Sequence, residues 1–119
     1  PAYNDLAWLL QKKGEYDKAE ELIRKALAID DRIYAYWDTL GETLMGKGRL
    51  DEAETAFREA LARYKEHPEV YLHLAEVKYR QGEKGAARDL LKMVSNRRDR
   101  LSNEAVDRFE KLRQTFSRE

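Results

Sequence analysis

The sequence predicts an all-α fold, a solenoid of three antiparallel helical hairpins with a seventh helix covering the last of them. Glycine recurs at one constant interval, at Gly14, Gly48 and Gly82, and an alanine stands at the same short distance after each. Around each glycine, apolar residues recur at i, i+3, i+4 and i+7, which is one face of an amphipathic helix. One such hairpin buries too little apolar surface to be stable. A hairpin repeated at this period therefore predicts a stacked array.

The middle repeat shows the pattern most clearly. Helix 34–46 carries its apolar residues on one face, and the turn Gly46-Lys47-Gly48 ends it. Gly48 supplies the left-handed backbone conformation that a helix end commonly needs. Helix 51–64 follows, with an inward face of Ala53, Ala56, Phe57, Ala60 and Leu61. Two helices so close in the chain must fold back on each other as an antiparallel hairpin.

The neighbouring repeats predict helices at 2–13 and 16–29 on one side and at 68–80 and 84–96 on the other. In the first of these helices, the residues expected to face inward are Tyr3, Leu6, Ala7 and Leu10. Pro68 suits the first turn of helix 68–80. Charged i,i+4 pairs such as Glu20–Arg24 and Glu54–Arg58 are interpreted as a solvated face.

A last helix is predicted at 103–117, with Ser102 or Asn103 as its N-cap. Its apolar residues lie four, four, three and four apart and form a single stripe, made of Leu101, Ala105, Phe109, Leu112 and Phe116. Charged residues occupy the other faces. The stripe predicts a capping helix that covers the apolar face of helix 84–96.

The repeat resembles the tetratricopeptide repeat (TPR), whose signature runs W-x2-L-G-x2-Y, then A-x3-F, then P. The middle copy matches it with Trp37-x2-Leu40-Gly41 and with Ala53-x3-Phe57. This resemblance divides the chain into repeats at about 1–33, 34–67 and 68–101 and a capping helix at 102–119, all in one domain. The phrases NDLAWLL, DTLGETL and HLAEV also resemble bacterial TPR proteins, including those associated with export and envelope assembly.

The chain departs from the TPR signature at two points. Leu10, Leu44 and Lys78 stand where the signature has tyrosine, and the terminal proline is missing from all three copies. Pro1 falls partway into the first repeat, so we expect a fragment of a longer protein, although loss of an initiator methionine would give the same start. A cytoplasmic and a bacterial periplasmic or envelope-associated location both remain open.

Composition disfavours several function classes. Lys and Arg number 23 and Asp and Glu number 23, so no global field draws in nucleic acid or an anionic membrane. The sequence contains no cysteine, which excludes a disulfide framework and thiol chemistry. No apolar run approaches the roughly 20 residues of a membrane span. We therefore expect no nucleic-acid partner and no direct membrane insertion.

The residues also give little support for catalysis. His67 and His73 lie on different faces of any helix, and no nearby residues complete a metal site. The three serines, in the C-terminal quarter of the chain, have no histidine near them in sequence. Neither glycine-rich turn fits a phosphate loop. The sequence predicts no enzyme, no metal and no cofactor.

The TPR resemblance implies that the inner face of each first helix lines a groove for extended peptides or partner helices. Carried through the repeats, this face comprises Asn4, Trp8 and Lys12; Asp38, Thr39, Glu42 and Met45; and Glu69, Leu72, His73, Glu76, Tyr79 and Arg80. With Asp5 added, it holds five acids and two bases, a net charge of −3. Trp8, Met45, Leu72 and Tyr79 offer apolar contacts. The predicted partner is a protein or peptide segment that is basic or neutral and carries an apolar anchor.

Some TPR domains hold the C-terminal carboxylate of heat-shock chaperones with a clamp of basic and amide side chains. The matching positions here contain no lysine or arginine, being Asn4, Trp8, Thr39, Glu69 and His73. We therefore expect no acidic chaperone tail in this groove, because Glu69 would repel a carboxylate.

Two alternatives stay open. Trp8 either packs on a preceding helix of the full-length protein or anchors a ligand. The chain is either a peptide-binding scaffold or an assembly module. In the second case its N-terminal end or last helix makes a homo-oligomer or docks another domain of the same protein.

Overall fold

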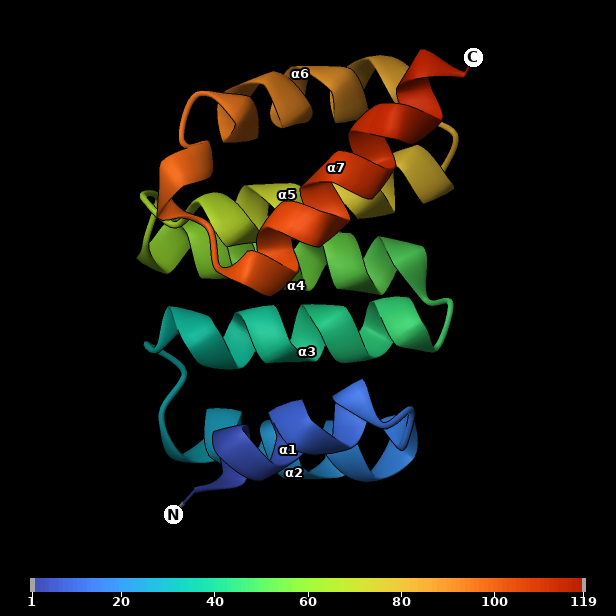
Figure 1. Cartoon of the computed structure of the whole chain (residues 1–119). Coiled ribbons are helices and arrows are strands. Elements are labelled where there is room, and N and C mark those ends of the chain that lie inside the picture. Colours follow the sequence, from blue (N-terminus) through green and yellow to red (C-terminus); the bar gives the residue numbers. More distant parts are fainter. Residues whose placement is uncertain (1, 119) are drawn as a thin grey trace. The chain divides into compact units, whose positions relative to one another are not determined.

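A computed structural model describes residues 2–118 and confirms the all-α fold, with helices and no strand in that range (Figure 1). Every α-helix begins and ends within one residue of its predicted bounds. The helices are α1 (Tyr3–Lys12), α2 (Tyr16–Ile29), α3 (Tyr34–Gly46), α4 (Leu50–Arg63), α5 (Pro68–Arg80), α6 (Lys84–Ser95) and α7 (Asn103–Ser117). A short 3-10 helix, η1 (Arg98–Arg100), precedes α7 and is not predicted by the sequence.

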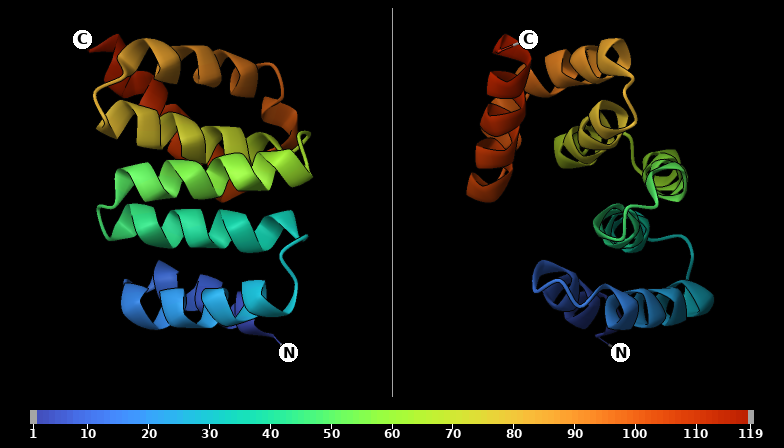
Figure 2. Two further views of the ribbon diagram at one scale, coloured as in Figure 1. Left: turned by 180° about the vertical axis from the view of Figure 1, so that it is seen from behind. Right: turned by 90° about the vertical axis from the view of Figure 1, so that its right-hand side faces the viewer.

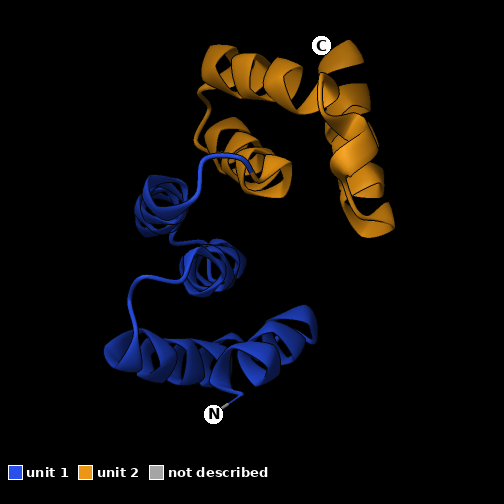
Figure 3. Ribbon diagram, turned by 90° about the vertical axis from the view of Figure 1, so that its left-hand side faces the viewer, with its two compact units in different colours: residues 1–66 blue, residues 67–119 orange. Residues whose placement is uncertain are grey.

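The chain divides into two compact units, residues 1–66 and residues 67–119 (Figure 3). In the first unit α1 packs against α2 and α3, α2 packs against α3, and α3 pairs with α4. In the second unit α5 pairs with α6, and α7 contacts both. The division falls beside the predicted boundary between the second and third repeats. That the units form one domain stays a prediction.

The three hairpin turns share one backbone geometry. Gly14, Gly48 and Gly82 have φ of +82°, +77° and +85°. At the middle turn, the Gly48 amide donates to the Met45 carbonyl at 3.0 Å, and the Arg49 amide donates to the Leu44 carbonyl at 3.0 Å. The same two bonds recur at the other turns. This is a Schellman motif, which requires a left-handed residue and therefore favours glycine at that position.

Close packing of small residues joins the two helices of the middle hairpin. Gly41 on α3 and Phe57 on α4 are both buried, and a Cβ atom on Gly41 would overlap the Phe57 ring. Ala53 and Ala60 are also fully buried on α4. The absent side chain at Gly41 lets α4 approach α3 closely, and Figure 2 shows the two helices side by side.

The inward face predicted for α1 is wrong at Leu6. Leu6 and Leu9 are 48% and 49% exposed, whereas Leu40 and Thr43, which hold the same repeat positions on α3, are 3% and 0% exposed. Within the described residues of the first unit, α3 packs against α1, α2 and α4, whereas α1 makes its main contacts with α2 and α3. The same repeat position is therefore covered on α3 and open on α1.

The interpretation of Glu20 as one half of a solvated pair is also incomplete. Glu20 accepts hydrogen bonds from Arg24 at 2.8 Å and from Lys47 at 2.7 Å, and Lys47 also meets Asp17 at 2.8 Å. The hydrogen bond from Lys47 holds the pKa of Glu20 below its ordinary value against desolvation by burial, and Arg24 adds to this effect. Glu20 therefore ties α2 to the end of α3.

The core of the second unit confirms the predicted apolar stripe of α7. Its buried residues come from all three helices and comprise Leu72, Ala75, Leu91, Val94, Ala105, Phe109 and Leu112. Leu101 and Phe116 pack around them. Ser102 caps α7, since its Oγ accepts a hydrogen bond from the Ala105 amide at 3.2 Å. The stripe covers α6 as predicted and, in addition, contacts α5.

Candidate binding surface

The face of α5 that was predicted to line the groove is covered by α7. In Figure 1, α7 runs obliquely across α5, and the two helices are in contact. Leu72, predicted to line the groove, is fully buried in the core beside Phe109 and Leu112. The α5 face, defined here as Glu69, Leu72, His73, Glu76 and Tyr79, is therefore a surface to which a helix is already bound.

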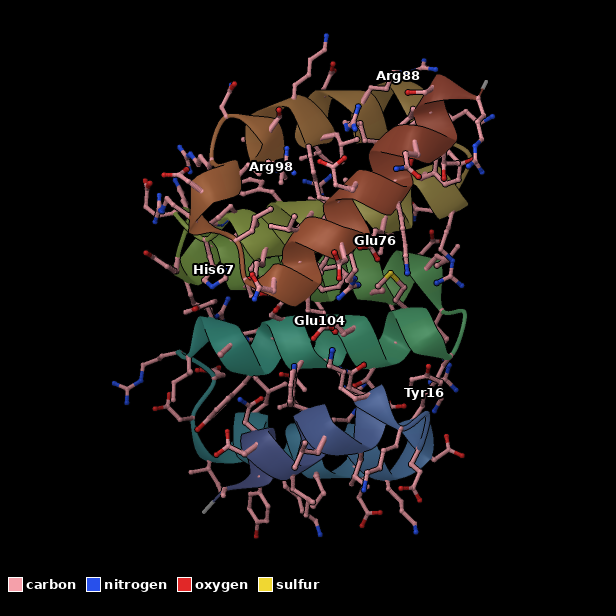
Figure 4. The ribbon with its side chains drawn as sticks, in the orientation of Figure 1. Tyr16, His67, Glu76, Arg88, Arg98 and Glu104 are labelled. Carbon is pink, nitrogen blue, oxygen red and sulfur yellow. The ribbon has the colours of Figure 1, made fainter. Side chains whose placement is uncertain are left out.

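Arg108 makes the polar contacts at the centre of the α5 face. Its Nε donates to Glu76 Oε1 at 3.0 Å and its Nη2 donates to Glu76 Oε2 at 2.8 Å. Its Nη1 lies 3.2 Å from His73 Nε2. A guanidinium has only donors, so Arg108 can only donate in this contact. One arginine thus satisfies an acid and a histidine on successive turns of α5. Glu76 is labelled in Figure 4.

The two ends of the α5 face also contact residues of the C-terminal segment. Glu69 Oε1 accepts a hydrogen bond from the Ser102 amide at 2.9 Å. The Tyr79 ring meets the Phe116 ring edge to face, with centroids 5.2 Å apart. Arg80 is the exposed member of the predicted set on this helix. Five of its six predicted groove residues thus contact Ser102 or α7.

On α3, the predicted residues are mostly buried. Glu42 accepts a hydrogen bond from Gln11 Nε2 on α1 at 3.2 Å. Thr39 is buried, and its carbonyl accepts from the Thr43 hydroxyl at 2.8 Å. Met45 is buried and Asp38 is half-buried. The contact of α1 with α3 accounts for the link between Gln11 and Glu42.

On α1, the predicted residues are more open. Trp8 is exposed, and the Lys12 ammonium lies 5.0 Å from the centre of its ring. Asn4 is half-buried, and its Oδ1 is buried without a hydrogen-bond donor. Trp8 therefore offers an accessible aromatic surface, which fits both interpretations given to it above.

Arg108 was not predicted from the sequence. It contacts a predicted groove acid, Glu76, that lies 32 positions away in the chain. Its position beside the apolar stripe of α7 is a weak signal, because pairing across helices depends on the crossing geometry. Arg98, in η1, pairs with Glu110 at 3.0 Å and lies 5.9 Å from the centre of the Phe109 ring. No helix within residues 2–118 is long and apolar enough to cross a membrane.

Models of the tetratricopeptide repeat match residues 1–33 and 44–107, and the second match alone covers more than half of the chain. The chain belongs to the tetratricopeptide repeat family. Members of this family are scaffolds for protein–protein interaction and are generally not enzymes, so the chain is a protein-interaction scaffold. No curated protein sequence matches this TPR chain significantly.

Solved TPR structures share the fold at low sequence identity. The Yersinia enterocolitica type III secretion translocator chaperone SycD is 18% identical with a TM-score of 0.79, over 97% of this chain and 81% of that one. SycD in complex with a peptide of the translocator YopD is 18% identical with a TM-score of 0.76, over 95% and 91%. MamA from Desulfovibrio magneticus RS-1 is 20% identical with a TM-score of 0.76, over 85% of this chain and 58% of that one.

Proposed function

We propose that this TPR chain binds a helical or extended protein segment on the inner faces of its first helices, and that the segment is basic or neutral with an apolar anchor. The observation that carries the proposal is the docking of α7 on the α5 face. There the chain's own helix presents Arg108 to Glu76 beside the apolar anchors Phe109 and Leu112. A partner segment with the same chemistry has the same means of binding.

The chemistry of the α5 face favours a basic ligand. A bidentate bond between arginine and a carboxylate is shorter and stronger than a neutral hydrogen bond and fixes the orientation of the ligand. Glu42 occupies the position of Glu76 on α3, one repeat earlier, so the acid recurs with the repeat. Trp8 adds an exposed aromatic ring on α1. The complex of SycD with a YopD peptide supports the same class of function.

The test uses a fluorescein-labelled peptide that copies residues 101–118, titrated into the full chain and followed by fluorescence polarisation. We expect saturable binding that weakens as salt rises, because screening acts over about 8–10 Å at physiological ionic strength. A control peptide with glutamate in place of the arginine corresponding to Arg108 should bind more weakly. In the chain itself, Arg108→Ala should strengthen peptide binding, because α7 then competes less well for the α5 face.

Charge-reversal variants identify the surface used. Glu42→Lys and Glu76→Lys should each weaken binding of the peptide. Glu54→Lys, on α4, is the control and should leave the affinity unchanged. Equal binding of the two peptides, or loss of binding with Glu54→Lys alone, would place the site elsewhere.

A second function, assembly, is favoured by the open end of α1. Leu6 and Leu9 are exposed at positions that are buried on α3, where α2 packs. Another helical hairpin could cover them, either from a second copy or from another domain of the same protein. Light scattering over a dilution series tests self-assembly. If Leu6 and Leu9 mediate it, Leu6→Glu with Leu9→Glu should shift the mass to that of a monomer. A mass that is already monomeric and independent of concentration would contradict self-assembly.

A further inference from the structure

The charge pattern of the second helices changes in the third repeat. On α2, Arg24 pairs with Glu20 at 2.8 Å, and on α4, Arg58 pairs with Glu54 at 2.9 Å. The corresponding residues on α6, one repeat after the α4 pair, are Arg88 and Lys92. An acid–base pair in two repeats has thus become two cations in the third.

These two cations border a cavity of about 330 Å³ between α6 and α7. Its apolar lining consists of Leu91, Phe109 and Phe116, and the hydroxyl residues Ser95 and Ser117 lie at its edge. Arg113 contributes a third cation from α7. Among residues 2–118, no carboxylate lines this cavity. Its volume falls in the range of small ligand sites, roughly 300–1,000 Å³.

One of these cations, Arg88, lies against the apolar lining of the α6–α7 cavity. The Arg88 guanidinium lies 5.0 Å from the centre of the Phe116 ring. Figure 4 shows Arg88 on α6. Arg113 donates to Glu110 at 2.6 and 3.0 Å, and Glu110 also pairs with Arg98 at 3.0 Å. Glu110 is thus shared by two arginines, and the surroundings of the cavity carry a positive balance.

We propose that the α6–α7 cavity is a second binding site, which takes an acidic peptide segment with one aromatic or aliphatic anchor. The anchor side chain enters between Phe109 and Phe116, and the flanking carboxylates meet Arg88, Lys92 and Arg113. Charge-assisted hydrogen bonds of this kind are the strong ones, and opposite charges also steer the approach of the partner. The site differs in position and in ligand charge from the inner faces discussed above.

Charge argues against a second copy of the chain as the occupant. Within the first unit, Glu20 on α2 receives Lys47 of the following repeat. The residue corresponding to Lys47 in the first repeat is Lys13, and the residue corresponding to Glu20 in the third is Arg88. A second copy stacked head to tail would therefore bring Lys13 to Arg88, and such like-charge contacts oppose association.

The test uses the full chain and a fluorescein-labelled decapeptide with four glutamates around one phenylalanine. A second decapeptide, with lysines in place of the glutamates, serves as the charge control. We expect saturable binding of the acidic peptide, followed by fluorescence polarisation, and much weaker binding of the basic one. Binding of the acidic peptide should fall as salt rises.

Variants then locate the acidic peptide. Arg88→Glu restores the charge pattern of α2 and α4, so the fold should tolerate it, and circular dichroism checks this. It should weaken binding roughly tenfold, which corresponds to the loss of one charge-assisted hydrogen bond. Lys92→Glu should act in the same direction. Lys111→Glu makes the same charge change on α7 outside the cavity lining and is the matched control.

Three results would overturn the proposal: no binding of the acidic peptide at millimolar concentration, equal binding of the basic peptide, or equal losses with Arg88→Glu and Lys111→Glu. Trp8→Ala, on α1, should leave acidic-peptide binding unchanged. The two proposals therefore fail or succeed separately.

Discussion

Both carboxylate oxygens of Glu76 are held by the guanidinium of Arg108, at 3.0 and 2.8 Å, and both side chains are half-buried. The two residues lie 32 positions apart in the chain, and their contact joins α5 to α7. It adds a directional polar link to the apolar stripe that α7 lays against α5 and α6. The last helix is therefore fixed in register as well as buried.

Arg108→Ala should lower the free energy of unfolding by about 1–3 kcal/mol, because it removes the guanidinium that contacts the half-buried Glu76 and the buried His73. Arg113→Ala is the matched control, since Arg113 also binds a carboxylate on α7 but is exposed. That change should cost less than about 1 kcal/mol. Urea denaturation measures both, and equal losses would show that the Arg108 contact adds nothing beyond a surface ion pair.

Removal of residues 102–119 should expose the apolar residues that α7 covers, among them Leu72, Leu91 and Val94. Terminal repeats need a polar outer face for solubility, so we expect aggregation or a large loss of stability. Light scattering and thermal denaturation of the shortened chain measure these effects. A monomer as stable as the full chain would mean that α7 is an independent appendage.

Ala53→Leu should destabilise the chain by about 1–3 kcal/mol through overpacking, since Ala53 is fully buried where α4 packs against α3. The control is Ala62→Leu, an exposed position on the same helix, which should change stability by less than about 0.5 kcal/mol. The midpoint of urea denaturation distinguishes them. An unchanged midpoint for Ala53→Leu would contradict the close packing.

The contribution of Glu20 to stability should depend on pH. The hydrogen bond from Lys47 lowers the pKa of Glu20 from 4.5, so the folded state favours the charged form. Its contribution is therefore full above pH 4.5 and is lost as the pH falls through the lowered pKa. Glu20→Gln should reduce stability at neutral pH, and the difference from the unchanged chain should shrink in acid.

The control for this pH effect is Glu21→Gln, because Glu21 is exposed and its contact with Lys25, at 3.6 Å, is longer than the hydrogen bonds that Glu20 accepts. The free energy of unfolding of the Glu21→Gln variant should follow that of the unchanged chain at every pH. Urea denaturation at several pH values between neutral and acid gives the comparison. A Glu20→Gln deficit that is the same at all pH values would rule out the titration of Glu20 as its source.

The helices and their turns could be predicted from the sequence because the residues that determine them are close together in the chain. Gly14, Gly48 and Gly82 adopt left-handed backbone conformations, and each of them ends a helix. The alanine that follows each glycine marks the face of the next helix that packs against its hairpin partner. The placement of α7 was only half predictable. Its apolar stripe shows that it is buried, but the stripe alone does not say that α7 contacts α5 as well as α6.

The candidate binding surface was harder to predict than the fold. Residues such as Glu76 and His73 were assigned to an inner face from the repeat, and the structure places both on one side of α5. Their partner Arg108 lies on a helix outside the repeat, so no periodicity connects them. Exposure of Leu6 also escaped prediction, because it depends on which helix packs beside α1.

The most direct measurement of the central claim uses the two tryptophans of the chain. Trp8 is exposed and is predicted to lie on the inner face of α1, whereas the indole N–H of Trp37 donates to the Asp31 carbonyl at 2.8 Å. Their two indole signals can be followed in a proton–nitrogen correlation spectrum while the peptide copying residues 101–118 is added. Binding on the inner faces predicts that the Trp8 signal shifts in proportion to the bound fraction while the Trp37 signal stays. A bound peptide that shifts Trp37 and leaves Trp8 in place would contradict it.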